Sequence, residues 1–285
     1  MSNRLNIAAV IAFCFCGMAA VAESPKSSGD KNSYSLFKPT PSDQMRELST
    51  DRPDVTESPY TVDAGHFQAE ISLFEYTYDD EGGRTDAVSI LPINLKVGLL
   101  NNVDLQFVVN PYVNVRTRTT GERGRRDHGF GETQLRLKVN LWGNDGGETA
   151  LALMPFISFP SAADGLGPER VEGGLIIPLS VSLPWEFEMG TMLEIDFVRN
   201  SANRGYGVQL VHSVTVGHKL WGELGGYAEY VGMTPIDTGA TYQAQMDFGL
   251  TYGIGENAQL DAGINVGITG AVDDFTVFMG VSFRM

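Results

Sequence analysis

The chain has 285 residues, a formal net charge of −15 at pH 7, 33 glycines and only two cysteines. So acidic a protein is a poor candidate for nucleic-acid binding, which needs a basic surface. After residue 22 no apolar run reaches about 18 residues, so helical membrane spans are excluded as well.

The amino terminus has the pattern of a secretory signal peptide. Arg4 supplies a basic start, residues 7–18 form an apolar stretch, and residues 20–22 (Ala-Val-Ala) form a small-residue cleavage site. We therefore expect residues 1–22 to be removed. Cys14 and Cys16 lie within the apolar stretch, so the mature chain would contain neither disulfides nor reactive thiolates.

Residues 132–141 show the pattern that dominates the rest of the chain. Every even position is polar or charged, and the odd positions are aliphatic except for Thr133. A period of two predicts a strand with one polar and one apolar face. Its length suits a transmembrane barrel strand, which needs about 9–11 residues.

The same alternation recurs along the chain and predicts an all-β, antiparallel transmembrane barrel of about 12 strands in residues 63–285. The predicted strands are residues 65–73, 91–97, 103–115, 132–141, 149–159, 171–183, 187–197, 208–216, 224–230, 242–254, 260–268 and 275–283. Short connections alternate with longer polar ones such as 117–131 and 161–170, as periplasmic turns and outer loops do. A soluble periplasmic β-sandwich would explain the composition but not this alternation.

Tryptophans and prolines bear on this assignment in opposite ways. Trp142, Trp185 and Trp221 all fall at short turns, where an interfacial aromatic belt would place them. Pro92, Pro111, Pro155 and Pro178 fall inside predicted strands, where each removes a ladder hydrogen bond. We expect bulges or shifted strand ends there. The alternation in residues 208–216 also places His212 on the lipid face.

Charges on the polar face are unevenly distributed between two sectors of the predicted barrel. Strands two to four contribute the basic residues, and strands seven to eleven contribute only acidic ones. The candidate pore-lining residues are Lys96, Arg116, Arg136 and Lys138 on one side, and Glu188, Glu194, Asp196, Glu229, Asp247 and Asp261 on the other. Two interpretations remain open: a transverse field that orients solutes, or a lumen packed shut by ion pairs.

The segment before the first strand, residues 23–62, is predicted to be irregular and periplasmic. It contains four charged residues, Asp51, Arg52, Asp54 and Glu57, among turn-forming residues. The segment could fold into the periplasmic mouth as a plug, with Arg52 pairing an inward carboxylate. Alternatively, it is only a turn that tethers the first strand.

The chain resembles the MetA-pathway phenol-degradation family of outer-membrane transporters. The shared motifs are Thr-Asp-Arg-Pro-Asp at 50–54, Thr-Glu-Ser-Pro-Tyr at 56–60, Gly65-x-Phe67-Gln68-x-Glu70, Leu91-Pro92 with Gly98, Gly129-x-Gly131-Glu132 with Lys138, and residues 152–160. The resemblance covers residues 49–285. It implies transport of aromatic compounds across the outer membrane.

We therefore expect a passive channel for small, aromatic or hydrophobic solutes, and alternatively a non-conducting structural or surface-interaction barrel. No enzyme is expected, because no histidine has a serine two positions away on the same strand face, as barrel phospholipases require. No cofactor or metal site is expected either. The expected partners are outer-membrane lipid, lipopolysaccharide, the barrel assembly machinery and small solutes; the sequence does not indicate an oligomeric state.

Overall fold

The computed structural model describes residues 31–80, 83–118, 124–199, 205–235 and 241–285. The predicted signal peptide, residues 1–22, lies outside this range. Within the described residues no helix has the length and apolar character to cross a membrane. The helical elements are three short 3-10 turns, η1 (Lys31–Ser33), η2 (Ser42–Gln44) and η3 (Pro184–Glu186).

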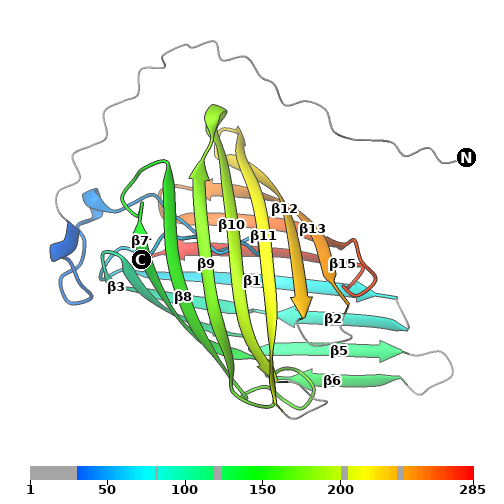
Figure 1. Cartoon of the computed structure of the whole chain (residues 1–285). Helices are drawn as coiled ribbons and strands as arrows, with labels where there is room; N and C mark the ends of the chain where they lie inside the picture. The colour runs from blue at the N-terminus through cyan, green and yellow to red at the C-terminus, as the bar shows by residue number, and fades with distance from the viewer. Residues whose placement is uncertain (1–30, 81–82, 119–123, 200–204, 236–240) are drawn as a thin grey trace, which may run out of the picture.

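The strands form one antiparallel sheet that closes on itself (Figure 1). They are β1 (Phe67–Asp79), β2 (Arg84–Ile90), β3 (Ile93–Leu100), β4 (Val103–Val109), β5 (Tyr112–Arg118), β6 (Arg125–Gly129), β7 (Thr133–Trp142), β8 (Thr149–Phe159), β9 (Glu172–Ser182), β10 (Phe187–Arg199), β11 (Tyr206–Trp221), β12 (Leu224–Pro235), β13 (Gln243–Ile254), β14 (Ala258–Gly267) and β15 (Phe275–Arg284). Closure comes from pairing of β1 with β15, from Gln68 opposite Arg284 to Tyr78 opposite Phe275.

Three of the wall strands are each broken into two segments, so that the barrel has 12 strands, as predicted. β2 and β3 are separated at Leu91-Pro92, β4 and β5 at Asn110-Pro111, and β6 and β7 at residues 130–132. At the first two breaks a proline lacks the N–H that a continuous ladder would use. The register is kept across the first break: the continuous β1 pairs with β3 from Phe67 opposite Val97, and in the same register with β2 as far as Asp79 opposite Thr85.

The other two prolines stay within their strands. Around Pro155 in β8, the register with β7 skips from Arg136–Phe156 to Val139–Leu153. Around Pro178 in β9, the register with β8 skips from Leu151–Leu179 to Met154–Ile176. The sheet therefore tolerates these prolines by leaving the ladder locally irregular.

The predicted loop at residues 117–131 was wrong in one respect, because it contains β6. This strand pairs with β5, with Val113 opposite Gly129 and Thr117 opposite Arg125. Its sequence, Arg-Arg-Asp-His-Gly, has no apolar face because both faces of the hairpin are in contact with water rather than lipid. Hydrophobic periodicity cannot identify a strand of this kind.

The barrel wall is apolar on its exposed outer face and polar on its buried inner face, which is the reverse of a soluble protein. Outward side chains such as Leu193 and Phe197 are 42% and 52% exposed, whereas the inward Asp104 and Lys138 are fully buried. His212 lies on the outward face, where its ring stacks on that of Tyr242. The hydroxyl oxygen of Tyr242 lies 3.3 Å from Nε2 of His212. This inverted pattern is that of a barrel whose outer surface meets lipid.

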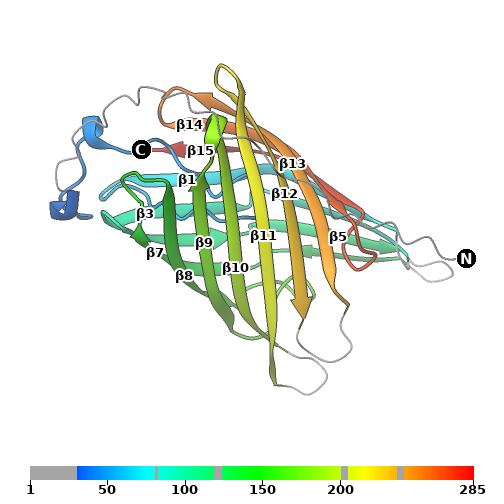
Figure 2. The same ribbon diagram turned by 45° about the horizontal axis from the view of Figure 1, so that its top comes forward.

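The chain before β1 lies at the same end of the barrel as the carboxyl terminus (Figures 1 and 2). That end also carries three short turns: Trp142 and Trp221 end the strands that lead into two of them, and Trp185 lies in the third, η3. Short turns mark the periplasmic end of an outer-membrane barrel. From η2 the chain turns into the barrel, and it joins β1 only after crossing the interior.

Candidate functional site

Residues 51–64, which we call the inner segment, cross the lumen and bond to both walls. Their partners lie on β1, β3, β4 and β7 on one side and on β11, β12 and β14 on the other. The segment does more than tether the first strand, because its contacts reach positions up to 221 residues away in the chain.

Asp51 binds the basic wall. Its two carboxylate oxygens lie 2.5 Å from Nζ of Lys96 and 2.6 Å from Nζ of Lys138. Lys96 also pairs with Glu70, which in turn accepts the backbone N–H of Asp51 at 3.1 Å. Burial alone would raise the pKa of Asp51, but the ammonium groups of Lys138 and Lys96 hold that pKa well below its usual range.

Arg52 binds the acidic wall on the other side. Its Nη2 lies 2.6 Å from Oδ1 of Asp261, and its Nε donates to Oδ2 at 3.2 Å, so the pair is bidentate. Arg52 also donates to Ser72. Two consecutive residues thus pair with opposite sectors of the barrel, Asp51 with the basic sector and Arg52 with the acidic one.

Glu229 of β12 holds the turn at residues 55 and 56. Its carboxylate accepts the backbone N–H groups of Val55 and Thr56, both at 2.7 Å, and the Thr56 hydroxyl at 2.5 Å. The same hydroxyl lies 2.6 Å from Oγ of Ser213 on β11. Asp54 has no cationic partner among the residues that the structure describes, and burial together with the nearby Glu229 carboxylate raises its pKa.

Glu57 contacts the basic wall, as Asp51 does. Its Oε1 lies 2.5 Å from Nη1 of Arg136 on β7. Burial and the nearby Asp51 carboxylate raise the pKa of Glu57 to about 7, despite the opposing effect of the Arg136 guanidinium. The ion pair is therefore held in an environment that penalises its negative charge.

The rest of the inner segment follows the β3–β4–β7 wall toward the periplasmic end. Asn140 donates to the carbonyl of Pro59 at 3.0 Å, and Asp104 accepts the N–H of Val62 at 3.0 Å. At Gly98 the segment approaches so closely that a Cβ would collide with the carbonyl of Asp63. Glycine is required at that position because the two backbones touch.

A buried charge cluster fixes the end of the inner segment beside β1. Asp63 is fully buried and pairs with Arg46 at 3.3 Å and with Arg284 of β15 at 3.4 Å. Arg46 also bonds Asp145, in a periplasmic turn, at 3.1 Å. Arg46 and Asp63 were not singled out in the sequence, because only the fold brings residues so far apart together.

The remaining candidate pore-lining residues occupy several environments. Glu194, Asp196 and Asp247 lie on the inward face, and Gln245 donates to both carboxylate oxygens of Asp247 at 2.9 Å. Arg116 is exposed on β5, opposite Asp86 and Arg126, beyond the strand breaks. Glu188 is exposed near the periplasmic rim, and neither it nor Arg116 is part of the inner-segment network.

A closed antiparallel barrel with an apolar exterior, a charged lumen and an internal amino-terminal segment defines an outer-membrane β-barrel protein. The fold is similar to that of an outer membrane channel from Pseudomonas putida F1, with a TM-score of 0.59 at 11% identity over 83% of this chain and 100% of that one. It is also similar to the NanC porin, with a TM-score of 0.51 at 9% identity over 75% and 100% of the two chains.

Residues 50–285 match the family described as "Putative MetA-pathway of phenol degradation", and the chain belongs to this family. The match begins at the residue before Asp51, so the family includes the inner segment as well as the barrel. No curated protein matches the chain.

Proposed function

We propose that this protein is a passive outer-membrane channel for small solutes, hydrophobic and aromatic ones among them, and that the inner segment is its plug. The single observation that carries the proposal is the pairing of Asp51 and Arg52 with opposite walls of the lumen. A segment that bridges both walls blocks the path between them. Aromatic solutes enter the proposal through the family, whose description refers to phenol degradation.

The plug is suited to release because ion pairs and hydrogen bonds, rather than a hydrophobic core, hold it in place. Each of these groups can exchange its partner for water once the segment moves. The charge asymmetry of the lumen would then be exposed: Lys96, Arg136 and Lys138 would face Glu229 and Asp261. The transverse field expected from the sequence belongs to this open state, and the ion-paired lumen belongs to the closed one.

Planar-bilayer recording tests the proposal. The mature protein should open rarely, and a variant that lacks residues 23–58 should show larger and more frequent conductance steps. Replacement of residues 51–57 by a Gly-Ser sequence of equal length is the matched control for truncation, and it should behave like the deletion. Silence from all three proteins, with the barrel shown to be folded by heat-modifiable gel mobility, would refute the channel and favour a non-conducting structural barrel.

The partners outside the lumen belong to the same proposal. The apolar exterior suits lipid, and the exposed Arg125 on β6, whose side chain is 69% exposed, suits the phosphates of lipopolysaccharide. Insertion of such a barrel requires the barrel assembly machinery. No cofactor or catalytic step is part of the proposal.

A further inference from the structure

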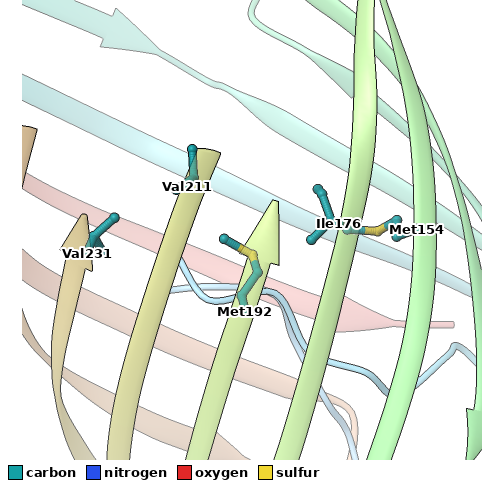
Figure 3. Close-up of a cluster of buried hydrophobic side chains, with 5 residues drawn as sticks. All are labelled: Met154, Ile176, Met192, Val211 and Val231. Atoms are coloured by element: carbon teal, nitrogen blue, oxygen red, sulfur yellow. The ribbon is translucent and has the colours of Figure 1, made fainter. Parts of the chain in front are cut away.

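One part of the inward face is mostly apolar, in contrast to the rest of the lumen. The acidic residue within it is Glu194 of β10, which lies opposite Ile176 of β9 and Val211 of β11. Met154, Ile176, Met192, Val211 and Val231 form a buried cluster on five neighbouring strands, β8 to β12, and each is at most 7% exposed (Figure 3). Phe156 and Met233 pack against it. We call these seven residues the lumen patch.

Strand alternation shows that the lumen patch faces inward. Met192 shares a face of β10 with Gly190, where a Cβ would lie 3.2 Å from Cγ2 of Thr56 in the inner segment, and Val231 shares a face of β12 with Glu229. The intervening Leu193 is 42% exposed on the lipid side. The patch is therefore a second surface of the lumen rather than part of the lipid-facing exterior.

The lumen patch lies on the extracellular side of the inner segment. β10 leaves a short periplasmic turn at η3 and runs outward, so Met192 lies farther out than Gly190. β11 runs in the opposite direction, and Val211 again lies farther out than Ser213, which contacts Thr56. A solute that enters from outside would meet this patch before the plug.

A carboxylate with spare acceptor capacity borders the patch. Asp196 is 8% exposed, and its Oδ1 has no hydrogen-bond partner among the described residues, while its Oδ2 accepts from Gln209 at 3.4 Å. Gly174 of β9 packs closely beside this atom: a Cβ there would lie 2.4 Å from the carbonyl oxygen of Ile195, 2.7 Å from Oδ1 of Asp196 and 2.8 Å from the ring of Phe156. A buried acceptor without a donor is costly, and a ligand can supply the missing donor.

We propose that the lumen patch and Asp196 form a binding site for a small apolar molecule that carries one hydrogen-bond donor, either a hydroxyl or an ammonium group. The apolar part would lie among the side chains of Met154, Ile176 and Met192, and the donor would reach Oδ1 of Asp196. Methionine side chains are flexible and polarizable, so they can rearrange around an aromatic ring. This inference rests on the proposed function, in which such solutes enter the lumen from outside.

Methyl NMR of the full mature protein in lipid nanodiscs, labelled with ¹³C at the methionine ε-methyl groups, tests the site. The probes are p-cresol, benzylamine and toluene, which share a ring and differ in the donor. Saturable ring-current shifts are expected at Met154, Met192 and Met233. Met279, which is 49% exposed on the lipid face, is the internal control and should not show them.

The donor determines the expected ranking of the probes. A hydrogen bond to a charged group contributes about 1.5–3 kcal/mol, so p-cresol or benzylamine should bind about tenfold or more tightly than toluene. The better of the two identifies the donor as hydroxyl or ammonium. Asp196→Leu should abolish the preference over toluene, whereas Asp127→Leu, on the exposed β6, should leave it unchanged.

Three results would overturn the site: linear shifts without saturation, equal shifts at Met279, or a preference for the donor that survives Asp196→Leu. The measurement does not depend on conductance. Saturable binding by a barrel that never conducts would refute the channel alone, and conduction without these shifts would refute the site alone.

Discussion

Removal of the Asp51 side chain should open the channel, because two buried ammonium groups depend on it. The side chains of Lys138 and Lys96 are 0% and 2% exposed, and Asp51 is the residue that links them to the inner segment. In Asp51→Leu, Lys96 keeps Glu70, but Lys138 loses its ion-pair partner. Loss of one member of a buried pair costs about 3–5 kcal/mol.

That penalty falls on the closed state, because water can solvate Lys138 once the segment leaves. The lower limit, about 3 kcal/mol, corresponds to a change of about 100-fold in the ratio of closed to open channels. The assay is the open fraction in planar bilayers at fixed voltage. Asp127→Leu removes a carboxylate paired with Arg125 on the exposed β6 and should change nothing.

A second substitution makes this prediction specific. Replacement of a whole buried ion pair by apolar residues is often neutral, so Asp51→Leu combined with Lys138→Met should be closer to the wild type than Asp51→Leu alone. An unchanged open fraction in Asp51→Leu, with the barrel folded, would refute the reasoning. Equal opening of the single and double variants would show that the unpaired lysine is not the cause.

Two further perturbations have defined outcomes. Conductance should rise with pH. The pKa of Glu57 is about 7 in the docked segment and 4.5 ordinarily, so the docked state holds the Glu57 proton more tightly. Docking is therefore most favoured below about pH 4.5, and its equilibrium constant falls by up to tenfold per pH unit toward pH 7. The raised pKa of Asp54 acts in the same direction, whereas Asp51, whose pKa is lowered, stays charged and does not oppose it in this range. A Glu57→Gln variant should show a flatter pH profile, and a profile that falls with pH would contradict the assignment. Gly98→Ala should lower the temperature of the heat-modifiability transition, since overpacking costs about 1–3 kcal/mol. Gly217→Ala is the control, because a Cβ there would meet nothing closer than 3.9 Å. Equal effects of the two substitutions would argue against close backbone contact at Gly98.

The sequence predicts the barrel well because each strand that crosses the membrane must present an apolar face to lipid. The strands around Leu135 and Leu193 alternate for this reason, and the inward position of Lys138 follows from the same pattern. Strand β6 was missed because, as a hairpin outside the lipid, it needs no apolar face. The breaks at Pro92 and Pro111 were anticipated as irregularities.

The interior is much harder to predict from the sequence. Arg52 and Asp261 are 209 residues apart, and no local pattern connects them. The charge sectors could be read from strand order, but the path of residues 51–64 between them depends on the closed barrel. The lumen patch was missed for a different reason: residues 149–159 and 171–183 are apolar on both faces, so alternation does not reveal that Met154 and Ile176 face the lumen.

A redox-switchable cross-link would test the plug most directly. Both cysteines of the chain, Cys14 and Cys16, precede residue 23, so a mature protein that carries Thr56→Cys and Ser213→Cys would contain only the introduced pair. The two native hydroxyl oxygens lie 2.6 Å apart. The account predicts a closed channel when the disulfide is formed and a return of conductance steps when it is reduced. Equal conductance in the two states, with the disulfide verified by mass spectrometry, would show that the inner segment does not control the lumen.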